Sequence, residues 1–247
     1  MKKFAVFSGF LGSGKTTAMT ALTRYCSSQG VSAAMISNDL GAGVELADDR
    51  FARLSGCRAA QITDECICYC GGVLEDRLNS FYEDGCELVI SDIPGFGVGA
   101  LEHVYLRPLG DPSSGFELAP FTVITEPRNV KTLFGDKGGD MSHIMDAQLK
   151  EADLIVLNKC DLISPSEADR LVKQLASRFP EAAVVAVSAA RGDGLDRLAE
   201  ALLRGRASMR RPDIDYGDER LIAEMDSLTE YYIQYRAEVC CDDFDGT

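Results

Sequence analysis

Residues 9–17, GFLGSGKTT, restrict the fold of this 247-residue chain more than any other segment. The apolar residues 4–7 before them predict a buried strand, and residues 18–25 after them predict a helix. Glycines in such a turn let successive backbone N–H groups point toward a phosphate at the start of the helix. The G-x4-G-K-T spacing therefore predicts a P-loop, in which Lys15 reaches the outer phosphates and Thr16 binds Mg²⁺. The expected phosphate-binding residues are Gly12, Ser13, Gly14, Lys15, Thr16 and Thr17.

Strand and helix patterns alternate along the rest of the chain. Further strands are expected at 32–36, 58–63 (a short edge strand), 87–92, 121–124, 154–157 and 183–187. Helices are expected at 73–82, around 144–149, from a capping box at Ser164 to Phe179, and at 194–203. Residues 106–120 are rich in Pro, Gly and Ser and predict a long loop beside the site. This alternation predicts a three-layer α/β fold, a mostly parallel sheet with helices on both faces.

The chain length and an apolar content of 46% predict one sizeable domain with a small extension. We expect residues 1–205 to form the P-loop domain and residues 206–247 to form a C-terminal extension or the remnant of a second domain. In this extension a helix is expected from Asp218 to Leu228, followed by a strand at 231–236. The final segment with Cys240 and Cys241 is either an acidic thiol tail or the start of a further domain.

The composition excludes some partners. A formal net charge of −14 argues against nucleic acid and anionic membranes, because both draw their affinity from Lys and Arg. The sequence has no run of 18 apolar residues, and its N-terminus leads directly into the first strand. We therefore expect a cytoplasmic protein with no nucleic-acid or membrane partner.

Polar residues stand at the carboxyl ends of the expected strands, which lie on one rim of a parallel sheet. Asp92 and Gly95 form a D-x-x-G segment, in which the Asp binds Mg²⁺ through water and the Gly N–H contacts the γ-phosphate. Asn38 and Asp39 follow another strand and are candidates for sensing the nucleotide, with Asp39 orienting the metal ion or the attacking water. The alternative is a turn in which both side chains bond to their own backbone.

A second motif on this rim, N-K-x-D, predicts the base. The Asp161 carboxylate, in the motif Asn158-Lys159-x-Asp161, can accept both the N1–H and the N2 amino group of guanine, while the stem of Lys159 can cover a face of the base. The segment Ser188-Ala189 resembles the backbone that reads guanine O6 in such proteins. The motif favours GTP over ATP, and it disfavours a small-molecule kinase.

Three of the nine cysteines, Cys66, Cys68 and Cys70, lie in one short segment. Clustered thiolates are ligands for a transition metal such as Zn²⁺ or Co²⁺. A tetrahedral site needs a fourth ligand, which Glu65, Asp39, His103 or a partner's thiol could supply. The alternative is a redox-active or buried cysteine cluster. Outside this segment, Cys26, Cys86 and Cys160 lie in apolar contexts that predict core packing.

Together these motifs resemble the CobW-type branch of the CobW, hydrogenase-maturation and urease-maturation GTPases. The matching positions, within 1–205, are Gly9 to Thr17, Asn38-Asp39 with Gly41, Cys66-Ile67-Cys68 before Gly71-Gly72, Asp92-x-x-Gly95, and Gln148-Leu149 with 152–156 ahead of Asn158-Lys159-x-Asp161. The resemblance implies a SIMIBI-class P-loop fold, slow GTP hydrolysis, a nucleotide-dependent homodimer and a role as metallochaperone or insertase. Here Tyr69 replaces the adjacent cysteine of the family's C-x-C-C motif, and the third thiol is at Cys70. The resemblance therefore does not imply which metal this chain binds or how tightly. Asp92 stands where many members have Glu.

Two functions follow as expectations. In the first, a GTPase with Lys15, Asp39 and Asp92 as catalytic residues delivers a metal ion or metallocofactor to a client metalloprotein, such as a corrinoid system. In the second, a regulatory GTP-binding switch controls a partner enzyme and the cysteines are structural.

Overall fold

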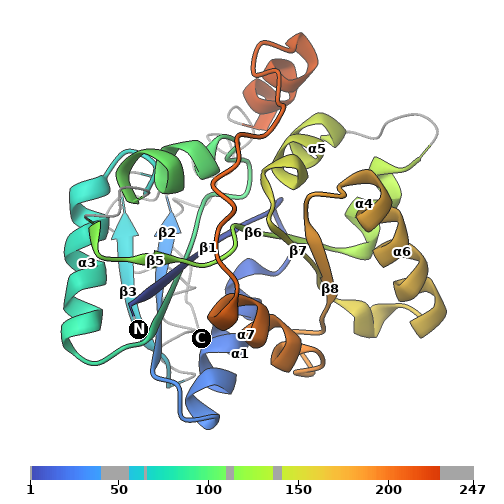
Figure 1. Ribbon diagram of the computed structural model, residues 1–247. Helices are drawn as coiled ribbons and strands as arrows, with labels where there is room; N and C mark the ends of the chain where they lie inside the picture. Colours follow the sequence, from blue (N-terminus) through green and yellow to red (C-terminus); the bar gives the residue numbers. More distant parts are fainter. Residues whose placement is uncertain (1, 40–55, 64–65, 110–113, 136–140, 229–247) are drawn as a thin grey trace, which may run out of the picture.

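The computed structural model describes residues 2–39, 56–63, 66–109, 114–135 and 141–228 (Figure 1). Within these residues, eight strands form one sheet in which all paired strands are parallel. The order across the sheet is β3-β2-β4-β1-β6-β7-β8, and β5 pairs with the first residues of β1. The strands are β1 Lys3–Ser8, β2 Ala33–Asp39, β3 Arg58–Thr63, β4 Leu88–Asp92, β5 Glu117–Leu118, β6 Thr122–Thr125, β7 Leu154–Leu157 and β8 Ala183–Ala186.

Helices cover both faces of this sheet. They are α1 Lys15–Ser28, α3 Gly71–Glu83, the π-helix η1 Leu101–Leu109, α4 Pro127–Leu133, α5 Ser142–Glu151, the 3-10 helix η3 Cys160–Leu162, α6 Pro165–Arg178, α7 Leu195–Arg204 and a helix at 219–228. One apolar core joins α1 and α7 to the face of β1 that carries Phe7. The other joins α3, η1 and α6 to the face that carries Phe4 and Val6. The predicted three-layer P-loop fold is therefore confirmed.

Most elements lie where the sequence predicts them. The strand at 58–63 has the expected bounds and forms an edge of the sheet. The capping box is also confirmed, since Ser164 Oγ accepts a hydrogen bond from the Glu167 N–H at 3.2 Å before Pro165 opens α6. Cys26 and Cys86 are buried in the two cores, as expected, whereas Cys160 is half-buried.

One expectation is wrong, and one helix was not expected. Residues 106–120 are not one long loop, because η1 extends to Leu109 and β5 pairs with β1. Tyr105 in η1 is fully buried, and its hydroxyl accepts a hydrogen bond from the Val6 N–H at 3.0 Å, which docks η1 on the sheet. Helix α4 was also not expected. It is short, and it begins at Pro127, which has a favourable φ for a first helical position.

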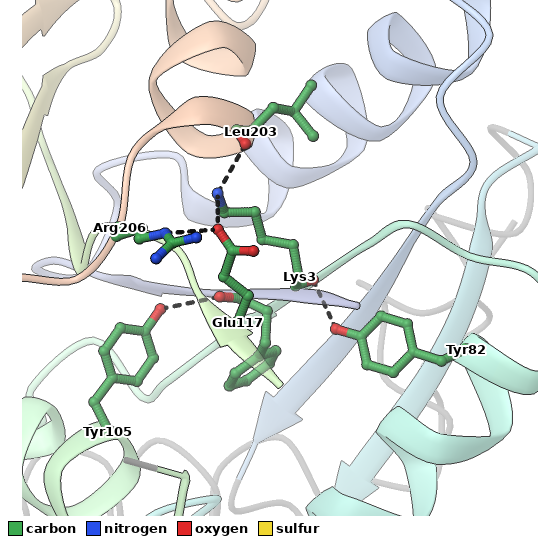
Figure 2. A network of polar contacts seen from close by, with 7 residues as sticks. Lys3, Tyr82, Tyr105, Glu117, Leu203 and Arg206 are labelled. Atoms are coloured by element: carbon green, nitrogen blue, oxygen red, sulfur yellow. Dashed lines mark hydrogen bonds and ion pairs between the residues drawn. The ribbon is translucent and has the colours of Figure 1, made fainter. Parts of the chain in front are cut away.

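The first residue of β1, Lys3, lies at the centre of a polar network at the end of the sheet opposite the P-loop (Figure 2). Lys3 is fully buried, and its Nζ donates to Glu117 Oε1 at 3.1 Å and to the Leu203 carbonyl at 2.8 Å. Arg206 also pairs with Glu117, at 3.2 Å, and Tyr82 donates to the Lys3 carbonyl at 2.6 Å. One side chain thus joins β1, β5 and the end of α7.

Just beyond α7, residues 207–210 lie against β5 and the end of α5. The Ala207 N–H donates to the Leu118 carbonyl at 3.0 Å, and Arg210 donates to the Ala152 carbonyl at 2.6 Å. The predicted helix from Asp218 to Leu228 is present at 219–228. The predicted strand at 231–236 and the two terminal cysteines lie outside the described residues, and the domain boundary at 205 stays a prediction. No described helix is long and apolar enough to cross a membrane.

Candidate functional site

The P-loop connects β1 to α1 and depends on glycines at two close contacts. Gly9 has a φ of 133°, and a Cβ there would overlap the Ile124 carbonyl oxygen. Gly14, the left-handed N-cap of α1, has a φ of 91°, and a Cβ there would lie 2.5 Å from Asn158 Nδ2. Strain and crowding together explain why both positions need glycine. The loop leaves backbone donors and the start of α1 facing a cavity.

This cavity has a volume of about 500 Å³ and lies at the carboxyl ends of the central strands. Its walls come from four segments that the sequence predicts to meet: the P-loop, the end of β2, the D-x-x-G segment and Lys159. The lining includes Gly12, Gly14, Lys15, Thr16, Thr17, Asn38, Asp92, Gly95 and Lys159. Ser13 is not among the lining residues; it is fully buried, and its carbonyl accepts a hydrogen bond from Asn158.

Asp92 and Asn38 are joined at the base of the cavity. Asp92 Oδ1 accepts a hydrogen bond from the Asn38 N–H at 2.8 Å. The Asn38 side chain then donates to the Ile62 carbonyl at 3.2 Å and accepts from the Ile67 N–H at 3.0 Å. Asn38 therefore bridges β2, β3 and the cysteine segment, instead of forming a local turn. Asp39 is the last residue of β2, and its role stays a prediction.

Gly95 brings the D-x-x-G loop against the P-loop. A Cβ on Gly95 would lie 2.9 Å from the Leu11 backbone nitrogen, so only glycine allows this approach. On the outer side, Gln148 Nε2 donates to the carbonyls of Gly95 at 3.1 Å and Gly97 at 3.0 Å. Gln148 contributes to the family resemblance, but the sequence did not indicate this role.

The N-K-x-D residues form hydrogen bonds with the P-loop and with the loop that follows β8. Asn158 Nδ2 donates to the Ser13 carbonyl at 3.0 Å, and its Oδ1 accepts from the Ala189 N–H at 3.1 Å. Asp161 Oδ1 accepts a hydrogen bond from Ser188 Oγ at 2.7 Å, and this bond lowers the pKa of the Asp161 carboxyl. The structure thus brings Asp161, Ser188 and Ala189 together beside the P-loop. Their contacts with guanine stay predictions.

Lys159 has a left-handed backbone, with a φ of 58°. Its Nζ donates to the Gly12 carbonyl at 2.6 Å and pairs with Glu126 Oε2 at 2.6 Å. Sequence reasoning missed Glu126. A signal was available, because Glu126 directly follows β6 and therefore lies on the same rim as the other candidates.

The three clustered cysteines do not all meet. The sulfurs of Cys66 and Cys68 are 3.0 Å apart and share a hydrogen bond. This bond lowers the pKa of Cys66 and raises the pKa of Cys68, which burial raises further. Cys70 is instead the N-cap residue of α3 and packs in the apolar core. In the described part of the chain, no three His, Cys, Asp or Glu side chains are grouped so that they could hold a metal ion.

The candidates for a further metal ligand remain predictions. The His103 ring lies against the ring of Tyr69, with centroids 5.7 Å apart. Glu65 lies outside the described residues. Cys66 and Cys68 alone offer two adjacent soft donors, of which Cys66 is the more easily deprotonated.

The chain is similar to known proteins at the level of a family model and of the fold. Residues 3–186 match the family model of the CobW/HypB/UreG nucleotide-binding domain. No curated protein sequence gave a significant match. Among solved structures, HypB from Helicobacter pylori in complex with nickel is 20% identical, with 81% of this chain and 85% of that chain covered and a TM-score of 0.57. HypB from Archaeoglobus fulgidus is also 20% identical, with 81% and 88% covered and a TM-score of 0.50.

A third similar structure is the signal recognition particle 54 kDa protein from Aeropyrum pernix K1 in complex with GDP. It is 18% identical, with 95% of this chain and 51% of that chain covered and a TM-score of 0.53. At these identities the structural likenesses concern the fold. The family match covers the P-loop, both rim motifs and the cysteine segment, and it ends before the extension at 206–247.

Proposed function

Because this chain belongs to the CobW/HypB/UreG family, we propose that it is a GTPase that couples GTP hydrolysis to delivery of a metal ion or metallocofactor. The receiver is a client metalloprotein, of which a corrinoid system is one example. The proposal includes a cytoplasmic location and a nucleotide-dependent homodimer, with no nucleic-acid or membrane partner.

The cavity supports the nucleotide half of this proposal. In our assignment the P-loop N–H groups and Lys15 bind the phosphates and stabilise charge that develops on them during transfer. Thr16 and Asp92 lie in the same cavity and offer the oxygen donors that Mg²⁺ prefers. Asp161 and the Ser188-Ala189 segment select guanine, and Asp39 orients the attacking water.

The observation that carries the coupling is the position of Asn38. Its N–H binds the Asp92 carboxylate, and its side-chain oxygen binds the Ile67 N–H between the two thiols. A change at Asp92 on loss of the γ-phosphate therefore reaches the Cys66–Cys68 pair through one residue. In our proposal this pair holds the transported ion, such as Zn²⁺ or Co²⁺, and the nucleotide state sets its affinity.

Metal titration in two nucleotide states tests this function. We expect Zn²⁺ or Co²⁺ to bind at least tenfold more tightly with a non-hydrolysable GTP analogue than with GDP, or the reverse, because coupling requires differential affinity. Combined Cys66→Ser and Cys68→Ser substitution should abolish the high-affinity site and leave GTP binding intact. Cys57→Ser, which changes a half-buried thiol outside this segment, is the matched control. Equal affinities in both nucleotide states would contradict the delivery function.

A second candidate is the regulatory switch with structural cysteines. It is favoured by the absence of a three-ligand group among the described residues and by the bond between the two thiols. If the wild-type chain hydrolyses GTP but binds no transition metal in either nucleotide state, this second function is supported.

A further inference from the structure

Residues 214–228 fold back over the loop that follows β4. Leu221 and Leu228 on the helix at 219–228 are buried against Ile144 and Ala147 of α5. Around them pack Phe10 of the P-loop, Phe96 and Val98 of the D-x-x-G loop, Met141, Ile214 and Met225. In Figure 1 this helix, coloured red, stands beyond the rim end of α5. We call residues 214–228 the C-terminal cover.

A polar contact fixes the C-terminal cover to α5. The Glu224 carboxylate accepts hydrogen bonds from the N–H groups of His143 at 3.0 Å and Ile144 at 2.9 Å, and it pairs with His143 Nδ1 at 2.7 Å. These N–H groups belong to the first turn of α5, where no partner exists within the helix and where negative charge is favoured. Glu224 therefore caps α5 from about 80 residues further along the chain.

Helix α5 in turn holds the loop that faces the nucleotide cavity. Gln148 donates to the carbonyls of Gly95 and Gly97. The Tyr216 ring of the C-terminal cover packs against Gly99, because a Cβ placed on this glycine would lie 3.8 Å from the ring. The segment from Gly95 to Gly99 thus contacts the P-loop on one side and the C-terminal cover on the other. The family match ends at residue 186, so it assigns no role to this contact.

We propose that the nucleotide controls the packing of the C-terminal cover on α5 and the D-x-x-G loop. Bound GTP weakens this packing, whereas bound GDP leaves it as it is in the structure. This inference rests on the proposed binding of GTP in the cavity. Release of the C-terminal cover exposes the apolar residues Phe96, Val98 and Ile144 beside the nucleotide site.

The direction follows from the crowding at Gly95. The loop approaches the P-loop so closely that one methyl group on Gly95 would lie 2.9 Å from Leu11 N. In our proposal the γ-phosphate accepts the Gly95 N–H and draws the D-x-x-G loop from its present contact with Leu11 toward the nucleotide. Because Phe96 and Val98 are packed with the C-terminal cover, this displacement separates apolar surfaces that are now in contact.

Hydrogen–deuterium exchange of the full chain measures this release. We expect backbone amides at 219–228 to exchange at least about fivefold faster with a non-hydrolysable GTP analogue than with GDP. The amides of α7, on the opposite face of the sheet, serve as the internal reference and should exchange equally in both states. Equal exchange at 219–228, or protection by the GTP analogue, would overturn the proposal.

Reciprocity provides a second test. If GTP weakens the C-terminal cover, a weakened cover must favour GTP by the same factor. Leu221→Ser, at a side chain that is 4% exposed, should raise the ratio of GTP-analogue to GDP affinity about fivefold. Ile222→Ser, at a neighbouring side chain that is 44% exposed, should leave the ratio unchanged.

A second pair of variants, with smaller changes to the side chain, separates this effect from a general loss of stability. Glu224→Gln removes the charge that caps α5 and should raise the same ratio, whereas Glu219→Gln changes an exposed carboxylate of the same helix and should not. An unchanged ratio in both Leu221→Ser and Glu224→Gln would overturn the inference while leaving the proposed GTPase intact. A wild-type chain that binds neither nucleotide would overturn both.

Discussion

Lys159 is held between a loop and a carboxylate. Its Nζ lies 2.6 Å from both the Gly12 carbonyl and Glu126 Oε2, and the Glu126 side chain is only 16% exposed. A lysine has a long flexible stem, so an ion pair at its tip restricts the positions that it samples. Glu126 therefore positions Lys159 across the part of the cavity where we place the guanine base.

Glu126→Gln should weaken GDP and GTP binding about fivefold, which corresponds to about 1 kcal/mol. In a Lys159→Met background the same substitution should have no further effect, because its only proposed action is through Lys159. Nucleotide titration of the wild type, both single variants and the double variant measures this coupling. Additive losses in the double variant would show that Glu126 acts independently of Lys159.

Glu151, the last residue of α5, is a carboxyl group with a strongly altered environment. Burial raises the pKa of Glu151 to about 8, although the N–H groups of Gly99 and Leu101 act in the opposite direction. Between pH 4.5 and about 8, Glu151 is therefore protonated in the folded protein and ionised in the unfolded chain. Folding stability should fall as the pH rises through this interval.

Glu151→Gln should remove this dependence, because the amide has a similar shape and does not ionise. Between pH 5 and about 8 the wild type should lose more unfolding free energy than the variant, and the variant should be the more stable protein at the upper end. Urea unfolding at both pH values measures the difference. Glu181→Gln, at an exposed carboxyl, is the control, and a variant curve parallel to the wild type would contradict the assignment.

Among the elements, the central strands could be predicted because parallel strands that are buried on both faces appear as continuous apolar runs. The apolar runs of β1 and β7 give their positions, and the motifs at their ends give the rim. Helix α4 and η1 could not be predicted in this way. The Pro, Gly and Ser content of 106–120 indicated a loop, but the contact of Tyr105 with β1 holds η1 as a helix. Helix α4 has only seven residues, too few for a clear helical pattern.

The site shows the same division. The P-loop, Asp92 and Asn158 were predictable because each is a short motif next to a buried strand. The place of Cys70 was not, because after the turn at 67–69 this residue becomes the N-cap of α3 and packs in the apolar core. The contacts of Gln148, Glu126 and Glu224 also could not be read from spacing, because each joins segments that are distant in sequence.

At the scale of the whole molecule, Lys3 connects β1 with β5 and with the end of α7. Its Nζ binds Glu117 after η1 and the Leu203 carbonyl at the end of α7 (Figure 2). Glu117 is additionally paired with Arg206, and the hydrogen bond from Lys3 lowers the pKa of the Glu117 carboxyl. A buried charge is costly unless it is fully bonded, so this network stabilises only as a complete set.

Lys3→Met should therefore destabilise the fold, although methionine retains most of the apolar stem. The substitution leaves the Leu203 carbonyl without its lysine donor and removes one of the two cations at Glu117, while Arg206 still screens that carboxylate. We expect a loss of about 2 kcal/mol in unfolding free energy, measured as a lower urea midpoint. Lys2→Met changes the neighbouring, exposed lysine and should leave the midpoint within about 0.5 kcal/mol of the wild type. Equal midpoints for the two variants would mean that β1, β5 and α7 are held together by their apolar contacts alone.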